Sequence, residues 1–220
     1  IDGNTVADEN GKVMKVEHSV YGGGEESAVN GNTSVTVTGG TIGTANEGGA
    51  EYGNVFGGGK GKEDDVTAGI VKGSTTVSIS GSPAILHNVY GGGAYGSVGT
   101  FSYDATGFPT GWTTTENKGK CTVSITGGTI GTTGDNNGMV FGSSRGLEGN
   151  PETNTNVDKM AWVYDTDVTI GTQSSETGPT VKGSVYGGGE NGHNFHDAKV
   201  TVHSGTIGIT EGSEIVNDGG

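Results

Sequence analysis

The sequence contains very little leucine, cysteine and proline, and these absences exclude several classes of protein. Of its 220 residues only Leu86 and Leu147 are leucines, which excludes a leucine-rich helical domain. Cys121 is the single cysteine, so the chain cannot form an intrachain disulfide and is not a disulfide-stabilised mini-domain. The four prolines are few and glycine does not occupy every third position, so the chain is not collagen.

Basic residues and long apolar runs are also scarce. Lysine and arginine number 11 against 25 aspartates and glutamates, which gives a formal net charge of -14. Nucleic-acid binding depends on clustered basic side chains, so we predict no nucleic-acid partner. No apolar run approaches the roughly 20 residues of a membrane-spanning helix, so we expect no membrane insertion in this segment. The first residues do not resemble a targeting peptide, and we expect no cofactor.

Glycine, in contrast, is abundant and recurs in a fixed context. Many of the 47 glycines follow a valine–aromatic step that occurs five times, at 20–24, 55–59, 89–93, 140–144 and 185–189. A second motif alternates threonine or serine with β-branched residues and also occurs five times, at 34–43, 76–81, 122–131, 167–171 and 199–208. Two motifs in constant order, each repeated five times, indicate a repeat protein.

The spacing within each repeat predicts its secondary structure. The second motif alternates with period two and stops at glycine, which is typical of a half-buried strand followed by a turn. The Thr-Ile-Gly step and the valine–aromatic step predict two further short strands. We therefore predict an all-β fold, a right-handed parallel β-solenoid (β-helix) of about five three-strand coils with long corner loops.

The alignment of the repeats also predicts which side chains face the core. Successive strand residues point to opposite sides, so every second residue should point inward. The inward columns are Val35, Val77, Val123, Val168 and Val200; Val37, Ile79, Ile125, Ile170 and Val202; and Ile42, Ile85, Ile130, Val181 and Ile207. Cys121 shares a register with Thr33, Thr75 and Thr166, which predicts a buried, unreactive thiol.

We expect residues 1–220 to form a single solenoid domain. The repeats occupy residues 20–209, whereas residues 1–19 match them poorly and are expected to form a capping or partial coil. Residues 210–220 are expected to be a truncated or capping end. Open solenoid ends expose edge strands, so we expect the chain to be a segment of a longer repetitive protein, with neighbouring repeats as partners.

The two motifs, V-[YF]-G-G-G and T-V-x-[IV]-[ST]-G-G-T-I-G, resemble repeat regions of large bacterial surface proteins. They are also similar in general form to the β-solenoids of adhesins and autotransporters. The resemblance covers roughly residues 20 to 209 and implies an extracellular location on the bacterial cell surface. Such repeats serve adhesion, polysaccharide cleavage or purely structural roles, so the resemblance alone does not fix an activity.

Aromatic residues concentrate in the corner insertions of the third and fourth coils. Aromatic faces flanked by polar groups are what sugar stacking requires, and insertions on a rigid scaffold are common binding sites. The alternative is a hydrophobic cluster that pins two long loops to the solenoid. The candidate ligand-binding residues are Tyr95, Phe101, Tyr103, Phe108, Trp112, Trp162 and Tyr164. A glycan or a host surface protein is the partner they would fit.

A second aromatic set repeats once per coil and is expected to be structural. It comprises Tyr21, Phe56, Tyr90, Phe141 and Tyr186. A fixed register predicts a stacked column of rings. Each ring neighbours an inward valine, so the column should face outward.

Two histidines and an aspartate in one short loop are weak candidates for metal ligands. His193, His196 and Asp197 combine imidazole and carboxylate groups, which suit zinc. The simpler interpretation is a polar surface loop. No third ligand stands nearby except His203, so we predict no metal site.

The outward positions leave an enzymatic alternative open. Asp167 and Lys199 should stack on adjacent coils with His203 on the same face, a set that a polysaccharide lyase could use. The alternative is a surface ion pair. We favour a non-enzymatic adhesin or stalk module that binds host or dietary glycans through its corner loops. A polysaccharide lyase or glycosidase and a purely structural spacer are the alternatives.

Overall fold

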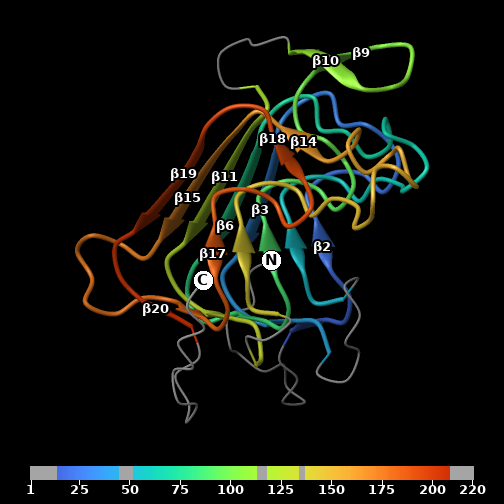
Figure 1. Ribbon diagram of the computed structural model, residues 1–220. Coiled ribbons are helices and arrows are strands. Elements are labelled where there is room, and N and C mark those ends of the chain that lie inside the picture. Colours follow the sequence, from blue (N-terminus) through green and yellow to red (C-terminus); the bar gives the residue numbers. More distant parts are fainter. Residues whose placement is uncertain (1–13, 45–51, 113–117, 134–136, 209–220) are drawn as a thin grey trace.

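The structure is a computed structural model that describes residues 14–44, 52–112, 118–133 and 137–208 (Figure 1). All regular elements in these ranges are β-strands, and most pair in parallel with the equivalent strand of the next coil. The predicted all-β parallel solenoid is therefore confirmed. No helix in the described ranges is long and apolar enough to cross a membrane.

Three parallel sheets run along the stack, each built from one short strand per coil. The first sheet contains β2 (Val20–Tyr21), β5 (Val55–Phe56), β8 (Val89–Tyr90), β13 (Val140–Phe141) and β17 (Val185–Tyr186). The second contains β3 (Thr33–Val37), β6 (Thr75–Ile79), β11 (Lys120–Ile125), β15 (Asp165–Ile170) and β19 (Ala198–Val202). The third contains β1 (Lys15–Val16), β4 (Thr41–Ile42), β7 (Ala84–Ile85), β12 (Thr129–Ile130), β16 (Thr180–Val181) and β20 (Thr206–Ile207).

The coils stack in register, as the repeat alignment predicted. Val35 pairs with Val77, and Val123 pairs with both Val77 and Val168. The valine and isoleucine columns of all three sheets form one core, and in the first four coils its members other than the partly buried Val20 are almost fully buried. In the fifth coil Val200, Val202 and Ile207 continue the columns but remain 42%, 53% and 41% exposed, because no described coil covers them.

A fourth, narrow ladder, which the repeats did not predict, also runs along the stack, with one short segment from each coil. It lies between the first and second sheets, where Val29 bridges Val71 and Val71 bridges Val98. In the fourth and fifth coils it widens into two paired strands, β14 (Trp162–Val163) and β18 (His193–Asn194). The inward side chains of this ladder pack against the buried Cys121. Burial raises the pKa of the Cys121 thiol to about 12, as expected for an unreactive cysteine.

The aromatic column is stacked and points away from the valine core, as predicted, but most of it is covered and not open to solvent. Adjacent rings lie 4.7 to 5.1 Å apart and within 9° of parallel. Phe56, Tyr90 and Phe141 are nevertheless at most 4% exposed. The column points away from the valine core, as strand alternation requires, but Ala94 and Tyr95 pack over it. It is therefore a second core.

The remaining elements are the antiparallel hairpin β9 (Phe101–Tyr103) and β10 (Pro109–Trp112). Figure 1 shows this hairpin projecting from one end of the strands of the second sheet, on the side of β14 and β18. The corner insertions of the third, fourth and fifth coils therefore meet in one region. That region contains the candidate site.

Candidate ligand-binding site

The site is a row of rings on the outer side of the fourth ladder. We call it the aromatic row and define it as Phe108, Trp162, Tyr164, His193, Phe195 and His196. Val163 is fully buried on the inner side of β14. Because strand side chains alternate, the residues on either side of Val163 point outward. In β18 the same alternation around Asn194 directs the rings of His193 and Phe195 outward, on the coil that follows β14.

Parallel pairing of β14 and β18 stacks the rings of the fourth coil on those of the fifth. Trp162 pairs with His193, and their rings stack 4.7 Å apart. The Tyr164 ring stacks on His196 at 5.1 Å and 9°, and it lies 5.9 Å from Phe195. Phe108, from the hairpin, meets Trp162 edge to face at 6.0 Å. Three insertions far apart in the sequence thus supply one continuous ring surface.

Trp162 is held in place by backbone contacts. Its indole Nε1 donates to the carbonyl oxygen of Asp158 at 2.9 Å, and its backbone N–H donates to Ser97 Oγ at 3.0 Å. The preceding residue, Ala161, is fully buried and has a φ of 59°. A non-glycine residue in this region is strained, and such strain concentrates at functional sites. The conformation re-aims the chain so that Trp162 faces outward.

One end of the row carries charged groups. His196 Nδ1 lies 2.9 Å from an oxygen of Asp165 and 3.6 Å from an oxygen of Asp197. The hydrogen bond with Asp165 and the negative charge of Asp197 raise the pKa of His196 above its ordinary value. The two carboxylates also supply acceptors for hydroxyl groups beside the Tyr164 ring.

Asp165, His196 and Asp197 come closer to a metal-binding arrangement than any other group among the described residues. Their potential ligand atoms all lie within 4.8 Å of one another, with Asp165 in the place that the sequence analysis gave to His193. His193 instead stacks on Trp162 and places Nε2 3.0 Å from the carbonyl oxygen of Val157. The His196 and Asp197 side chains are 53% and 82% exposed. We interpret the group as a surface ion-pair cluster.

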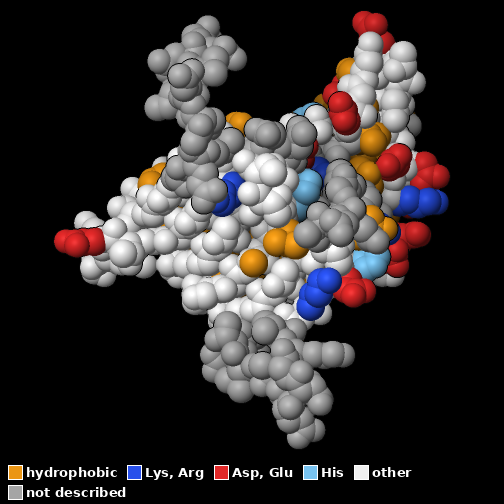
Figure 2. Space-filling view, turned by 90° about the horizontal axis from the view of Figure 1, so that it is seen from below, with side chains coloured by type: hydrophobic (Ala, Val, Ile, Leu, Met, Phe, Trp, Pro, Cys, Tyr) orange, Lys and Arg blue, Asp and Glu red, His pale blue; other side chains and the backbone are white. Residues whose placement is uncertain are grey.

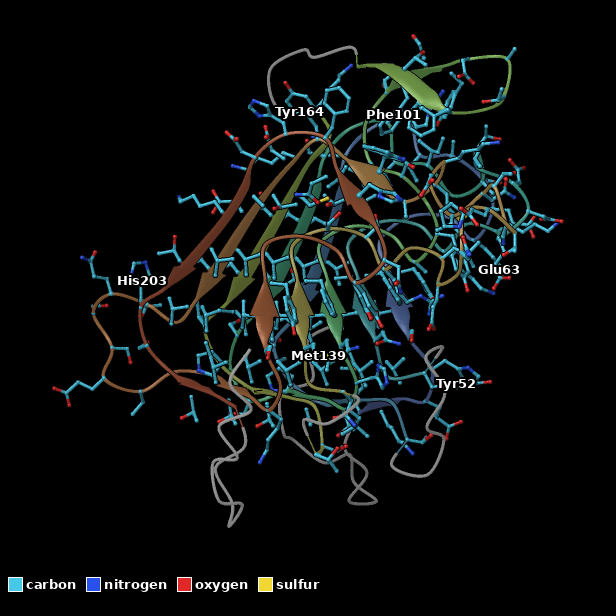
Figure 3. The ribbon with its side chains drawn as sticks, in the orientation of Figure 1. Tyr52, Glu63, Phe101, Met139, Tyr164 and His203 are labelled. Carbon is cyan, nitrogen blue, oxygen red and sulfur yellow. The ribbon has the colours of Figure 1, made fainter. Side chains whose placement is uncertain are left out.

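The structure places the seven candidate aromatic residues in different surroundings. Phe108, Trp162 and Tyr164 lie in the aromatic row, and Figure 3 shows Tyr164 near the upper end of the molecule. Phe101 and Tyr103 contact each other at 6.1 Å in strand β9. The backbone of Trp112 pairs with Phe101, and the side chain of Trp112 lies outside the part of the chain that the structure describes.

Tyr95 and Tyr103 serve the packing of the loops. The Tyr95 hydroxyl donates to Glu63 at 2.8 Å, and the Arg145 guanidinium lies 4.7 Å from the Tyr95 ring centre. The buried Arg145 thereby fixes Tyr95 against the solenoid. Burial raises the pKa of the Tyr103 hydroxyl to about 12. For these two residues the loop-pinning alternative describes the geometry better than sugar stacking.

In the second polar set, Asp167 and Lys199 form an ion pair on adjacent coils. Lys120 lies 3.2 Å and Lys199 3.7 Å from the carboxylate oxygens of Asp167. The carboxylate is thus shared between two lysines of adjacent strands. Among the described residues, neither Asp167 nor His203 belongs to a cluster of three potential metal ligands. This geometry gives no support to a lyase site.

Phe195 was not among the predicted ligand-binding residues, and His193 and His196 were considered only as weak candidates for metal ligands, although all three complete the row. The signal that identifies them is the alignment of β14 with β18, which places Trp162 beside His193. That alignment depends on the fourth ladder. Searches of protein-family models, curated proteins and solved structures found no match to this chain.

Proposed function

We propose that this chain is a non-enzymatic module of a bacterial surface protein that binds glycans through the aromatic row. The observation that supports the proposal most is the continuity of the row across two coils. Its outer members are open to solvent, with Phe108 37% and Phe195 50% exposed. Contiguous exposed aromatic surface on a rigid scaffold is typical of a binding site.

The chemistry of the row suits a carbohydrate chain. The C–H faces of pyranose rings stack on aromatic rings, and their hydroxyl groups require acceptors at the edge. Asp165 and Asp197 provide such acceptors beside Tyr164. With a net charge of -14, the module should favour neutral or cationic glycans over sulfated or uronate-rich ones.

The location at the cell surface is part of the proposal. It depends on the resemblance of the two motifs to bacterial surface repeats. The solenoid itself would act as a stalk, because parallel coils project the corner loops at a fixed distance along the stack. The adhesin and stalk roles are therefore compatible.

A glycan microarray probed with the purified chain tests the proposal. We expect binding to one class of neutral glycan, and Phe195→Ala and Trp162→Ala should each weaken it about tenfold through lost ring contact. Tyr186→Ala is the matched control, because Tyr186 is an exposed aromatic residue, 45% accessible, that lies outside the row. Far-ultraviolet circular dichroism would establish that each variant remains folded.

Two results would overturn the proposal. One is an array without binding by the wild-type chain, which would favour the spacer alternative. The other is binding that the two row variants leave unchanged. Turnover of a polysaccharide that depends on Asp167 would instead establish the enzymatic alternative.

A further inference from the structure

We propose that the His196 imidazole is a pH-dependent cover for the Tyr164 ring, closed when it is protonated and open when it is neutral. The inference concerns the regulation of the aromatic row, and its effect on glycan binding rests on the proposed function. The imidazole lies over the Tyr164 ring, with ring centres 5.1 Å apart and planes 9° from parallel. A sugar that stacks on this face of Tyr164 needs the same position, so the imidazole must move before the sugar binds.

The cover has a fixed backbone and a mobile side chain. The backbone N–H of His196 donates to the carbonyl oxygen of Tyr164 at 3.0 Å, which holds the two residues side by side. The imidazole itself is 53% exposed. Exposed side chains change rotamer rapidly, so the ring can leave Tyr164 without any movement of the solenoid.

The charge of the imidazole decides how firmly it is held. Its Nδ1 lies 2.9 Å from an oxygen of Asp165 and 3.6 Å from an oxygen of Asp197. The protonated ring is attracted by both carboxylates and by the electron-rich face of Tyr164. The neutral ring loses these charge interactions and keeps at most the hydrogen bond with Asp165. Protonation therefore closes the cover, and deprotonation exposes the Tyr164 face together with the two carboxylates.

The other titratable groups nearby are separated from the cover or held by other partners. They are Lys118, Lys120, His193 and Lys199. The Tyr164 backbone lies between His196 and the two lysines of the third coil, because its N–H donates to Gly119 and its carbonyl accepts from His196. The ammonium groups of Lys120 and Lys199 lie beside Asp167. His193 places Nε2 3.0 Å from a backbone carbonyl oxygen.

Asp165 and Asp197 are thus the charged groups that set the state of the cover. The hydrogen bond with Asp165 and the charge of Asp197 raise the pKa of His196 above 6.5. The closed state is fully favoured below pH 6.5 and is lost as the pH rises through the raised value. The aromatic row should therefore bind glycans more tightly in mildly alkaline than in mildly acidic solution.

NMR of the free protein between about pH 5.5 and pH 8.5 tests the cover without a ligand. Nuclear Overhauser effects between the rings of His196 and Tyr164 report the stacked state. We expect these effects at the lower pH and their loss as the pH rises through the pKa of His196. This measurement does not depend on the identity of the glycan.

Isothermal titration with cellohexaose, maltohexaose and mannohexaose at the same two pH values tests the effect on binding. The probes are neutral because the chain carries -14, and Figure 2 shows acidic side chains gathered at the right of the face in view. We expect a probe that binds to have a Kd about threefold lower at pH 8.5, the size of a surface ion pair. By linkage, saturation with that probe should lower the pKa of His196 by about 0.5.

Three variants assign the pH dependence to His196. His196→Gln should bind the probe equally at both pH values, because it carries no titrating group. Asp165→Asn should move the midpoint of the pH dependence to lower pH, which a purely structural role of His196 would not do. His203→Gln is the matched control and should keep the wild-type dependence, because Figure 3 shows His203 at the other end of the second sheet from Tyr164.

Two results would overturn the inference. One is a set of His196–Tyr164 ring signals that does not change across the titration of the free wild-type chain. The other is a pH dependence of Kd that His196→Gln retains. Absence of binding by all three probes, with the ring signals still titrating, would count against the proposed function and support the cover.

Discussion

A methyl group on Gly57 would collide with the carbonyl oxygen of Gly91, the equivalent residue of the next coil. It would also lie 3.0 Å from a methyl carbon of Val77, in the core. The glycine therefore permits two coils to approach at the corner, and its role is steric. The same relationship holds for Gly22, Gly91 and Gly142 with the coils that follow them.

Gly57→Ala should therefore destabilise the solenoid by about 1–3 kcal/mol, because the backbone of the next coil must move. Gly188→Ala is the control: Gly188 lies in the corresponding glycine run of the fifth coil, and among the described residues no heavy atom apart from its chain neighbours lies within 4 Å of an added Cβ. Urea denaturation followed by circular dichroism measures both. Equal midpoints for Gly57→Ala and Gly188→Ala would contradict the steric explanation.

A second prediction concerns the register that Cys121 shares with three threonines. The hydroxyl groups of Thr33, Thr75 and Thr166 each donate to the carbonyl oxygen of a glycine in the next coil, at 2.5 to 2.6 Å. Gly142 occupies the equivalent place after Cys121. Cys121→Thr should add the missing hydrogen bond and stabilise the protein by about 1 kcal/mol.

The control for this substitution is Cys121→Val, which has the shape of threonine without its hydroxyl group. Thermal unfolding of both variants and the wild type separates the hydrogen bond from the change in packing. If Cys121→Thr melts no higher than Cys121→Val, the hydroxyl contributes nothing at this position.

The sequence predicts the sheets well because their signal is periodic. Val35, Val77 and Val123 stand in the same position of a repeated motif, and strand alternation then decides which side they face. The fourth ladder has no such signal. Val29, Val71 and Val98 contribute one bridging residue each, and Val71 stands farther from the preceding valine–aromatic motif than the other two. A single residue per coil cannot establish a period.

The site is predictable only in part, for a related reason. Phe108 and Trp162 lie in the insertions of adjacent coils, so the sequence correctly indicates that these two insertions meet. The position of Tyr95 depends instead on Arg145, a residue of the following coil whose guanidinium lies over its ring. The burial of the aromatic column likewise depends on loops that pack over it. Contacts between irregular segments of different coils leave no pattern in the sequence.

The last prediction concerns the protonation of His196. Its pKa is raised above 6.5 chiefly by the hydrogen bond with Asp165, so the ion pair is fully present below pH 6.5 and is lost as the pH rises through the raised value. In an NMR titration of the imidazole signals, Asp165→Asn should lower the pKa of His196 towards 6.5. Asp167→Asn is the control, because Asp167 pairs with Lys120 and Lys199 and should leave the titration of His196 unchanged. A pKa of His196 that is the same in Asp165→Asn as in the wild type would show that the two side chains do not interact in solution.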